Sequence, residues 1–284
     1  MKKLIFTLIA VLVIVFAALS VLGASGEYSA EKALYYALKA NEAIVMNPDV
    51  APPAQIAAIE TRLKALIAKY PDTNSVRTAN IGLLEFYITH KKYDEAKSLA
   101  GNILVKYKDD PIVSSTAQFL KGVISEKQNN WDRALEEFKI LNDRYPNTEL
   151  GMQIPLYIGR YYDSKGLDEK SKDAYRNAVA FYSKMEEEYS GKMLGYTASA
   201  FRIQAYLNLK DYEAAGNALD GTIRKYSSTL SFVQLLPLVE KIYIENLKNP
   251  QKAAEIYKYV MSKTKNPKIL KFLTKKIKAA EAKK

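Results

Sequence analysis

Residues 115–146, STAQFLKGVISEKQNNWDRALEEFKILNDRYP, predict two helices joined by a polar turn. After the turn, Ala134, Phe138 and Leu141 follow the three- and four-residue spacing that places apolar side chains on one face of a helix. Pro146 marks the end of the second helix, because proline lacks the amide donor that a continuing helix needs. The segment therefore predicts a helix–turn–helix unit.

The turn of this unit recurs along the chain. A polar turn, an aromatic residue and an alanine that opens a helix occur in Lys92-Tyr93-Asp94-Glu95-Ala96, Asn130-Trp131-Asp132-Arg133-Ala134 and Asp211-Tyr212-Glu213-Ala214-Ala215. A tyrosine follows eleven residues after an alanine in four places, Ala96 to Tyr107, Ala134 to Tyr145, Ala178 to Tyr189 and Ala215 to Tyr226. Counted from Tyr70, successive tyrosines lie 37, 38, 44 and 37 residues apart. The chain therefore contains internal repeats with a period of about 37 residues.

The repeats differ in length and clarity. An insertion around residues 168–180 is expected to lengthen the second helix of the third unit by about two turns. A first hairpin over 28–45 and 54–70, and a last unit with Ala253 and Tyr257, follow from the register alone. No segment after Glu27 has a convincing strand pattern. We predict an all-α solenoid of about five to six hairpins over residues 27–265.

These residues resemble the tetratricopeptide repeat (TPR) family, whose unit is a helix–turn–helix of about 34 residues. Gly122 matches the small residue of the family's first helix, Ala134 the small residue at the helix crossing, Phe138 the aromatic residue one turn later, and Pro146 the terminating proline. The repeat ends Tyr-Pro-Asp and Tyr-Pro-Asn look most like TPR proteins of the bacterial cell envelope. These include the assembly lipoprotein of the outer-membrane β-barrel machine and the periplasmic TPR protein of the Tol–Pal system. This chain lacks the lipobox cysteine of the former.

The resemblance implies a superhelix whose first helices line a concave face, where a peptide is held by apolar pockets and side-chain hydrogen bonds. The concave positions that the family register implies are Ile81, Glu85, Phe119, Val123, Leu156, Arg160, Ala200 and Gln204. Further aromatic candidates for this groove are Tyr35-Tyr36 and Tyr161-Tyr162. The repeated register favours packing between repeats, rather than stacking on glycans, for Tyr107, Tyr145, Tyr189 and Tyr226.

The composition argues against most enzyme classes. The chain has no Cys and a single His, His90, which excludes disulfides and thiolate metal sites and disfavours histidine-based catalysis. Neighbouring residues on a helix point about 100° apart, so the runs Glu136-Glu137 and Glu186-Glu187-Glu188 are interpreted as solvated faces rather than acid/base pairs. His90 is expected to be exposed and inert. No phosphate-loop, dinucleotide or zinc motif occurs. We therefore expect neither catalysis nor a cofactor.

The first 24 residues are typical of an export signal. Lys2 and Lys3 precede the segment 4–22, which carries no charge. Small residues near Ser20 and Ala24 suit cleavage, but about 20 apolar residues also suffice to span a bilayer. Residues 1–24 are therefore expected to be either a signal peptide or an uncleaved anchor in the inner membrane. In both cases the body is expected to be extracytoplasmic, in the periplasm.

The net charge of +11 resides mainly at the C-terminus. The first three residues hold two Lys and residues 263–284 hold nine Lys and one Glu, which leaves 31 basic and 30 acidic residues between them. A body with so little excess charge argues against nucleic-acid binding. Residues 267–284 predict a basic amphipathic helix with Ile269, Leu273 and Ile277 on its apolar side. This helix is expected to cap the last repeat, the alternative being a contact with anionic lipid or an acidic partner.

The sequence thus predicts a non-enzymatic exported scaffold that binds proteins or peptides and helps assemble or organise complexes of the cell envelope. The alternative is a membrane-anchored, chaperone-like accessory subunit of a secretion or translocation apparatus. Composition and motifs leave open the identity of the partner, the oligomeric state and the cleavage of the N-terminal segment.

Overall fold

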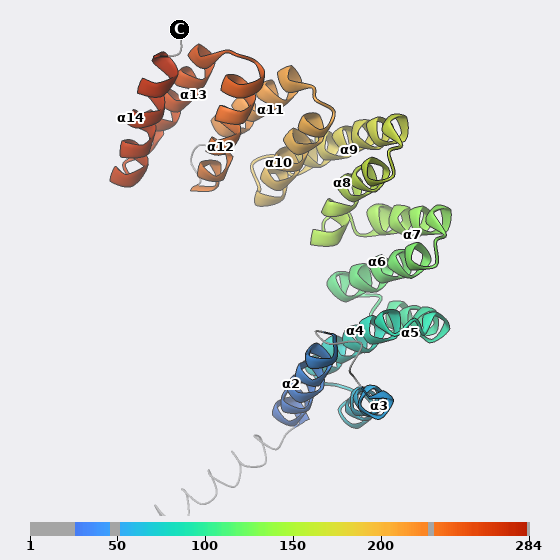
Figure 1. Ribbon diagram of the computed structural model, residues 1–284. Helices are drawn as coiled ribbons and strands as arrows, with labels where there is room; N and C mark the ends of the chain where they lie inside the picture. Colours follow the sequence, from blue (N-terminus) through green and yellow to red (C-terminus); the bar gives the residue numbers. More distant parts are fainter. Residues whose placement is uncertain (1–25, 46–51, 227–229, 283–284) are drawn as a thin grey trace, which may run out of the picture. The chain divides into compact units, whose positions relative to one another are not determined.

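A computed structural model of the chain describes residues 26–45, 52–226 and 230–282 (Figure 1). These residues contain helices and no strands, which confirms the all-α prediction for the part that is described. The chain divides into two compact units, Met1–Leu150 and Gly151–Lys284. Whether 27–265 form one domain stays a prediction, and the predicted export segment, residues 1–24, lies outside the described residues.

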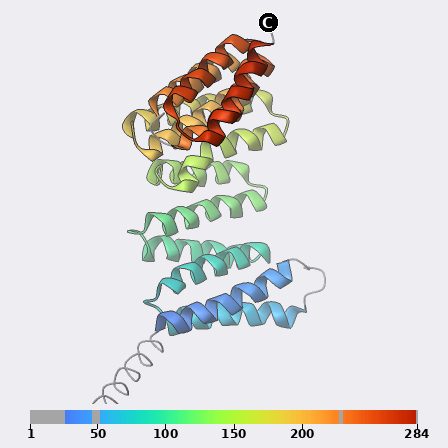
Figure 2. The same cartoon turned by 90° about the vertical axis from the view of Figure 1, so that its left-hand side faces the viewer.

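The first unit stacks three helical hairpins. Consecutive helices contact one another (Figure 2). The first helices of neighbouring hairpins are also in contact, because α4 packs against both α2 and α6. The helices are α2 (Gly26–Val45), α3 (Pro53–Lys69), α4 (Asn74–Thr89), α5 (Tyr93–Lys106), α6 (Pro111–Lys127) and α7 (Trp131–Arg144). The first hairpin and the repeat of residues 115–146 therefore lie where the register predicts them.

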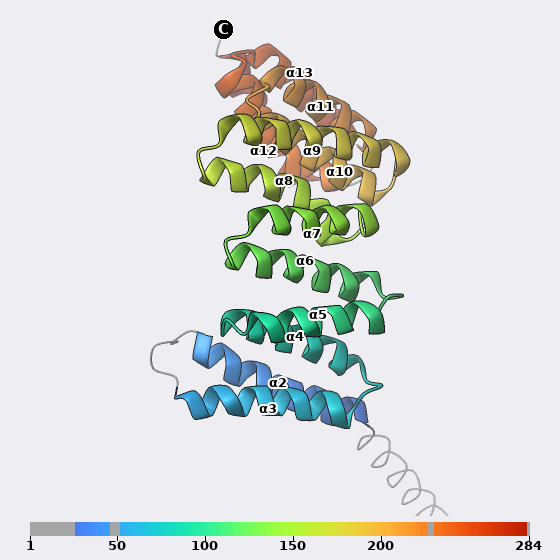
Figure 3. The same cartoon turned by 90° about the vertical axis from the view of Figure 1, so that its right-hand side faces the viewer.

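The second unit continues the same pattern with two irregularities (Figure 3). Its elements are α8 (Glu149–Ser164), α9 (Asp168–Glu188), α10 (Met193–Asn208), α11 (Tyr212–Lys225), η1 (Leu230–Leu235), α12 (Leu236–Val239), η2 (Glu240–Asn246), α13 (Pro250–Lys263) and α14 (Pro267–Glu281). Helix α9 has 21 residues against 14 in α7 and α11, which confirms the predicted lengthening. The first helix of the last hairpin instead consists of 3₁₀, α and π segments in succession.

Five turns inside hairpins of the described residues share a left-handed residue. Its φ is 58° at Lys91, 59° at Asn129, 65° at Gly166, 58° at Lys210 and 53° at Lys248. The following amide reaches back over the turn; Lys92 N donates to Tyr87 O at 2.8 Å and Asp211 N to Tyr206 O at 3.0 Å. This bonding closes the end of a helix by satisfying carbonyls that lack partners within the helix. The sequence repeat of the turns therefore reflects one backbone conformation.

Replacing Lys210 by glycine is expected to stabilise the second unit by about 0.5–1 kcal/mol. A left-handed conformation costs an L-residue about 1 kcal/mol or more, whereas glycine adopts it without strain. The higher conformational entropy of glycine in the unfolded chain offsets only part of the stabilisation that relief of this strain provides. Urea unfolding measures the difference. Lys184→Gly, within α9, is the control and should destabilise by about 1 kcal/mol. Equal losses in both variants would show that the left-handed turn is not strained.

Close approach of paired helices depends on glycine opposite an aromatic ring. A Cβ placed on Gly122 of α6 would lie 2.2 Å from Cε1 of Phe138, and one placed on Gly159 of α8 would lie 2.3 Å from Cε1 of Tyr175. Phe138 and Tyr175 are essentially fully buried. The absence of a side chain at Gly122 therefore lets α6 and α7 approach closely, and Tyr175 has the same place in the longer hairpin as Phe138.

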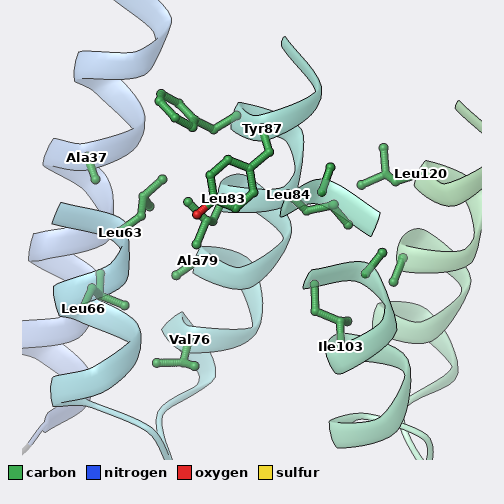
Figure 4. Packing of buried hydrophobic residues seen from close by; sticks show 14 of the residues in the cluster. Ala37, Leu63, Leu66, Val76, Ala79, Leu83, Leu84, Tyr87, Ile103 and Leu120 are labelled. Atoms are coloured by element: carbon green, nitrogen blue, oxygen red, sulfur yellow. The ribbon is translucent and has the colours of Figure 1, made fainter. Parts of the chain in front are cut away.

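Leucine, isoleucine, valine and alanine side chains from successive helices fill the core of the first unit. Figure 4 shows Leu63 and Leu66 of α3 facing Val76, Ala79 and Leu83 of α4. Ile103 of α5 and Leu120 of α6 extend the same cluster into the next hairpins. Each hairpin therefore buries its apolar face against its neighbours, as expected for a repeat that cannot form a core alone.

Helix α14 closes the second unit against α13. Leu273, Ile277 and Ala280 are buried, whereas Ile269 and Leu270 are half-buried. Leu273 and Ile277 belong to the same apolar cluster as Tyr257 and Val260 of α13. The predicted cap is therefore present, and its apolar side faces the last repeat.

Candidate functional site

The eight predicted groove residues lie on the first helices of hairpins, four in each unit. In the first unit, Ile81 and Glu85 belong to α4 and Phe119 and Val123 to α6. Helices α4 and α6 are in contact, so these four residues belong to neighbouring elements. In the second unit, the other four lie on α8 and α10, as follows: Leu156, Arg160, Ala200 and Gln204.

The four positions of the first unit differ in accessibility. Ile81 and Phe119 are half-buried and pack against the core, and the ring of Phe119 lies 5.8 Å from that of Phe138. Val123 is half-buried, and Glu85 is exposed. The neighbouring side chains still desolvate the Glu85 carboxyl group enough to raise its pKa. Glu85 is therefore the position of this set that a partner can reach most readily.

In the second unit, accessibility is concentrated at one position. Leu156 is 3% exposed and belongs to the core with Met152 and Tyr175, so it serves packing. Ala200 is half-buried against the neighbouring cluster. Gln204 is half-buried and donates from Nε2 to Oδ1 of Asn208 at 2.9 Å. Arg160 alone of the four is exposed.

Two of the predicted solvated carboxylates are instead structural, which corrects the sequence interpretation. Glu137 is 2% exposed, and its carboxylate accepts from Nε2 of Gln118 at 2.7 Å. It also pairs with Lys121 at 3.0 Å and with Arg133 at 2.9 Å. Burial opposes its ionisation, but the hydrogen bonds from Lys121 and Gln118 and the charge of Arg133 outweigh burial and lower the pKa of Glu137. Its inward placement follows from its position three residues after Ala134 on the buried side of α7.

Glu137 forms part of a polar pocket of about 370 Å³ in the first unit. The other lining residues come from α5, α6, α7 and the turn before α7, and they are Lys97, Lys121, Ser125, Gln128, Asn130 and Arg133. In the second unit, Glu186 of α9 pairs with Arg202 of α10 at 2.8 Å and with Lys225 of α11 at 3.6 Å. Both carboxylates therefore bridge helices through basic side chains.

A third carboxylate, Glu60 of α3, links the first two hairpins. It accepts from Lys64 Nζ at 2.7 Å, from Tyr87 Oη at 3.2 Å, and from Lys92 Nζ at the turn before α5. The hydrogen bond from Lys64, followed by that from Lys92, lowers the pKa of Glu60 to about 2. Because the folded state holds this pKa below the ordinary value of 4.5, the stabilisation is present above pH 4.5 and is lost as pH falls through about 2.

We expect Glu60→Gln to destabilise the first unit by about 1 kcal/mol at pH 7, a small value because Lys64 and Lys92 are substantially exposed. The difference from the parent should vanish as pH approaches 2, where the parent carboxylate also becomes protonated. Urea unfolding at both pH values measures this. A difference that stays constant with pH would mean that Glu60 acts through packing alone.

The remaining candidates also take definite places. His90 is half-buried, with its ring centroid 4.4 Å from that of Phe86, and burial lowers its pKa, so the expectation of an exposed histidine is wrong. Tyr226 is buried, whereas Tyr107, Tyr145 and Tyr189 are half-buried at helix ends. Tyr35 and Tyr36 of α2 are 57% and 56% exposed. In the described part of the chain, no group of three or more His, Asp or Glu side chains could hold a metal ion.

Comparisons with known proteins agree with the repeat. Residues 116–148 match the family model of the tetratricopeptide repeat. A search of curated proteins finds no match. Among solved structures, BtubC (BKLC) from P. vanneervenii is similar at a TM-score of 0.35 with 12% identity, covering 91% of this chain and 88% of that one. A tetratricopeptide repeat protein from Parabacteroides merdae ATCC 43184 is similar at 0.36 with 13% identity, covering 87% and 99%.

The identification of a tetratricopeptide repeat rests on the family match at residues 116–148 and on the spacing of the repeats, because structural similarity at these TM-scores does not support a family. The matched residues include most of α6 and all of α7, with Gly122 against Phe138; the same turn recurs in other hairpins, and the glycine contact recurs at Gly159. Among helices in the described part, none is long and apolar enough to cross a membrane. Residues 116–148 are therefore a tetratricopeptide repeat, a unit whose fold suggests a scaffold for protein–protein interactions.

Proposed function

We propose that the protein is a non-enzymatic scaffold, exported to the cell envelope, where it binds protein partners during the assembly or organisation of envelope complexes. The scaffold role is supported by the stack of helical hairpins with the repeat match at 116–148. The export is supported by the sequence of residues 1–24, in which two lysines precede an uncharged apolar segment.

The surface of α4 and α6 in the first unit is the proposed docking face. The two helices are neighbours. Helix α4 carries Glu85, whose carboxyl is partly desolvated, one turn after the half-buried Ile81, and α6 carries the half-buried Val123. An exposed carboxylate beside apolar side chains is complementary to an extended or helical peptide in which a basic residue lies next to an apolar one.

Photo-crosslinking in cells tests this face in the full chain. A photoreactive amino acid at position 85 or 123 should trap the same partner, whereas one at Asn102 or Val105 on α5 should not. Asn102 and Val105 are matched controls because they are exposed on a second helix of the same unit. Equal trapping from both helices, or trapping from α5 alone, would contradict a docking face on α4 and α6.

N-terminal sequencing of the protein recovered from cells tests the export. A chain that starts near Gly23 or Ser25 supports a released periplasmic adaptor. Retention of 4–22, together with accessibility of the body to protease added outside the inner membrane, supports an anchored form. An uncleaved chain whose body is protected from that protease would contradict export.

A further inference from the structure

Helix α14 has two chemically different faces. Leu273, Ile277 and Ala280 are buried against the last repeat. Four lysines, Lys268, Lys271, Lys275 and Lys278, are all exposed. At about 100° per residue these lysines fall within an arc of roughly 80° on the side of the helix opposite Leu273, and they extend over about 15 Å. We call these four residues the lysine stripe.

Acidic side chains do not neutralise the lysine stripe. Within the described residues, none of its four lysines forms an ion pair. The nearby carboxylates are used elsewhere, since Glu281 pairs with Lys258 at 2.7 Å and Glu240 pairs with Lys276. The body of the chain is close to neutral, so this local charge is not part of a general excess. The stripe therefore presents a concentrated positive potential to a partner.

The type of residue indicates the type of partner. Residues 263–284 contain nine Lys and no Arg. Lysine acts as a compact point charge, whereas arginine provides the fork that recognises one carboxylate or phosphate in a defined geometry. Phe272, beside the stripe, is 42% exposed, and a helix that combines lysines with an exposed aromatic ring is typical of the membrane interface. These features favour a broad anionic surface over a single bound group.

We propose that the lysine stripe of α14 docks the protein on a bilayer that contains anionic phospholipid, while the opposite face of the same helix caps the repeat (Figure 1). This role is separate from the docking face on α4 and α6, and it does not depend on whether residues 1–24 are cleaved.

Fluorescence of the full chain tests the proposal at a defined position. The chain has no Cys, so Ala279→Cys provides a unique site for a polarity-sensitive fluorophore at the exposed edge of the stripe. The probes are vesicles of phosphatidylcholine alone and of phosphatidylcholine mixed with phosphatidylglycerol. We expect a blue shift only with the mixed vesicles. Each lysine near an anionic surface strengthens binding by about fivefold, so four should give several hundredfold at low salt.

The charge dependence separates the stripe from the N-terminal segment. An inserted apolar segment 4–22 would hold the chain on both kinds of vesicle alike, without moving the label at position 279 into lipid. The blue shift of the stripe should disappear in concentrated salt, which screens exposed charges. Charge-independent binding with an unshifted label would therefore support the segment 4–22 as an anchor and overturn the lysine stripe.

Two variants with the same loss of charge complete the experiment. Replacing Lys268, Lys271, Lys275 and Lys278 with Gln should abolish the blue shift and leave thermal unfolding unchanged. Replacing four exposed lysines elsewhere, Lys108, Lys127, Lys184 and Lys241, should leave the blue shift intact. The same loss in both variants would overturn the proposal. A shift with heparin or polyglutamate but with neither kind of vesicle would also overturn it, in favour of an acidic polymer as partner.

Discussion

Removal of residues 267–284 is expected to destabilise the second unit by about 5 kcal/mol, because the burial of one leucine or isoleucine side chain contributes about 1.5–3 kcal/mol and the truncation loses two such side chains. The change deletes buried Leu273 and Ile277 and uncovers Tyr257 and Val260 of α13, which are at most 1% exposed. Thermal unfolding by circular dichroism should show a much earlier transition, and the truncated chain should aggregate through the uncovered face.

The matched control keeps every apolar residue of α14. Lys268, Lys271, Lys275 and Lys278 are exposed without ion pairs in the described structure, so their replacement by Gln should leave the melting temperature at the parent value. A truncated chain that melts together with the parent would mean that α14 does not stabilise the last repeat. The comparison thus separates the buried face of the helix from the lysine stripe.

Gly122→Ala is expected to destabilise the first unit by about 2 kcal/mol, although alanine is the better helix former by about 1 kcal/mol. The new Cβ would lie 2.2 Å from Cε1 and 2.6 Å from Cδ1 of Phe138. The Phe138 ring is fully buried and neighbours the rings of Phe119 and Trp131, so it has little room to move. Overpacking of this kind costs about 1–3 kcal/mol. Equilibrium unfolding in urea measures the loss.

Gly101→Ala is the control for this substitution. Gly101 lies inside α5, and a Cβ placed there meets no atom within 4 Å. The variant should be more stable than the parent by up to about 1 kcal/mol, since only helix propensity changes. In the double variant Gly122→Ala/Phe138→Leu, the smaller side chain should recover part of the loss. Stabilisation by Gly122→Ala alone would show that the close approach of α6 and α7 does not depend on glycine at position 122.

Several structural features could be predicted from local sequence patterns. The polar turn before Tyr93, Trp131 and Tyr212 predicted the starts of second helices, and α5, α7 and α11 begin at these residues. Local patterns sufficed because the turn and the first residues of the helix interact within a few positions of the chain. The irregular first helix of the last hairpin was not predicted, since a π segment after Pro237 has the same apolar spacing as an α-helix over one turn.

The candidate site was predicted less well than the fold. The family register placed all eight groove residues on first helices, yet Leu156 is in the core. A register specifies the position of a residue along a helix but not how closely the neighbouring helix covers it. Glu137 was assigned to a solvated face because carboxylates are rarely buried. Its two cationic partners are Lys121, which lies on α6, and Arg133, which lies one turn earlier on α7.

The sequence by itself determined the repeat period, the hairpin turns and the C-terminal amphipathic helix, because short-range hydrogen bonding and helical periodicity encode each of them. Only the tertiary structure decided which polar groups are buried. Gln118 and Lys121 come from a different helix than Glu137, and their contact with it forms when the two helices pack. The lysine stripe emerged in the same way, since packing of Leu273 and Ile277 against α13 turns Lys268, Lys271, Lys275 and Lys278 together toward solvent.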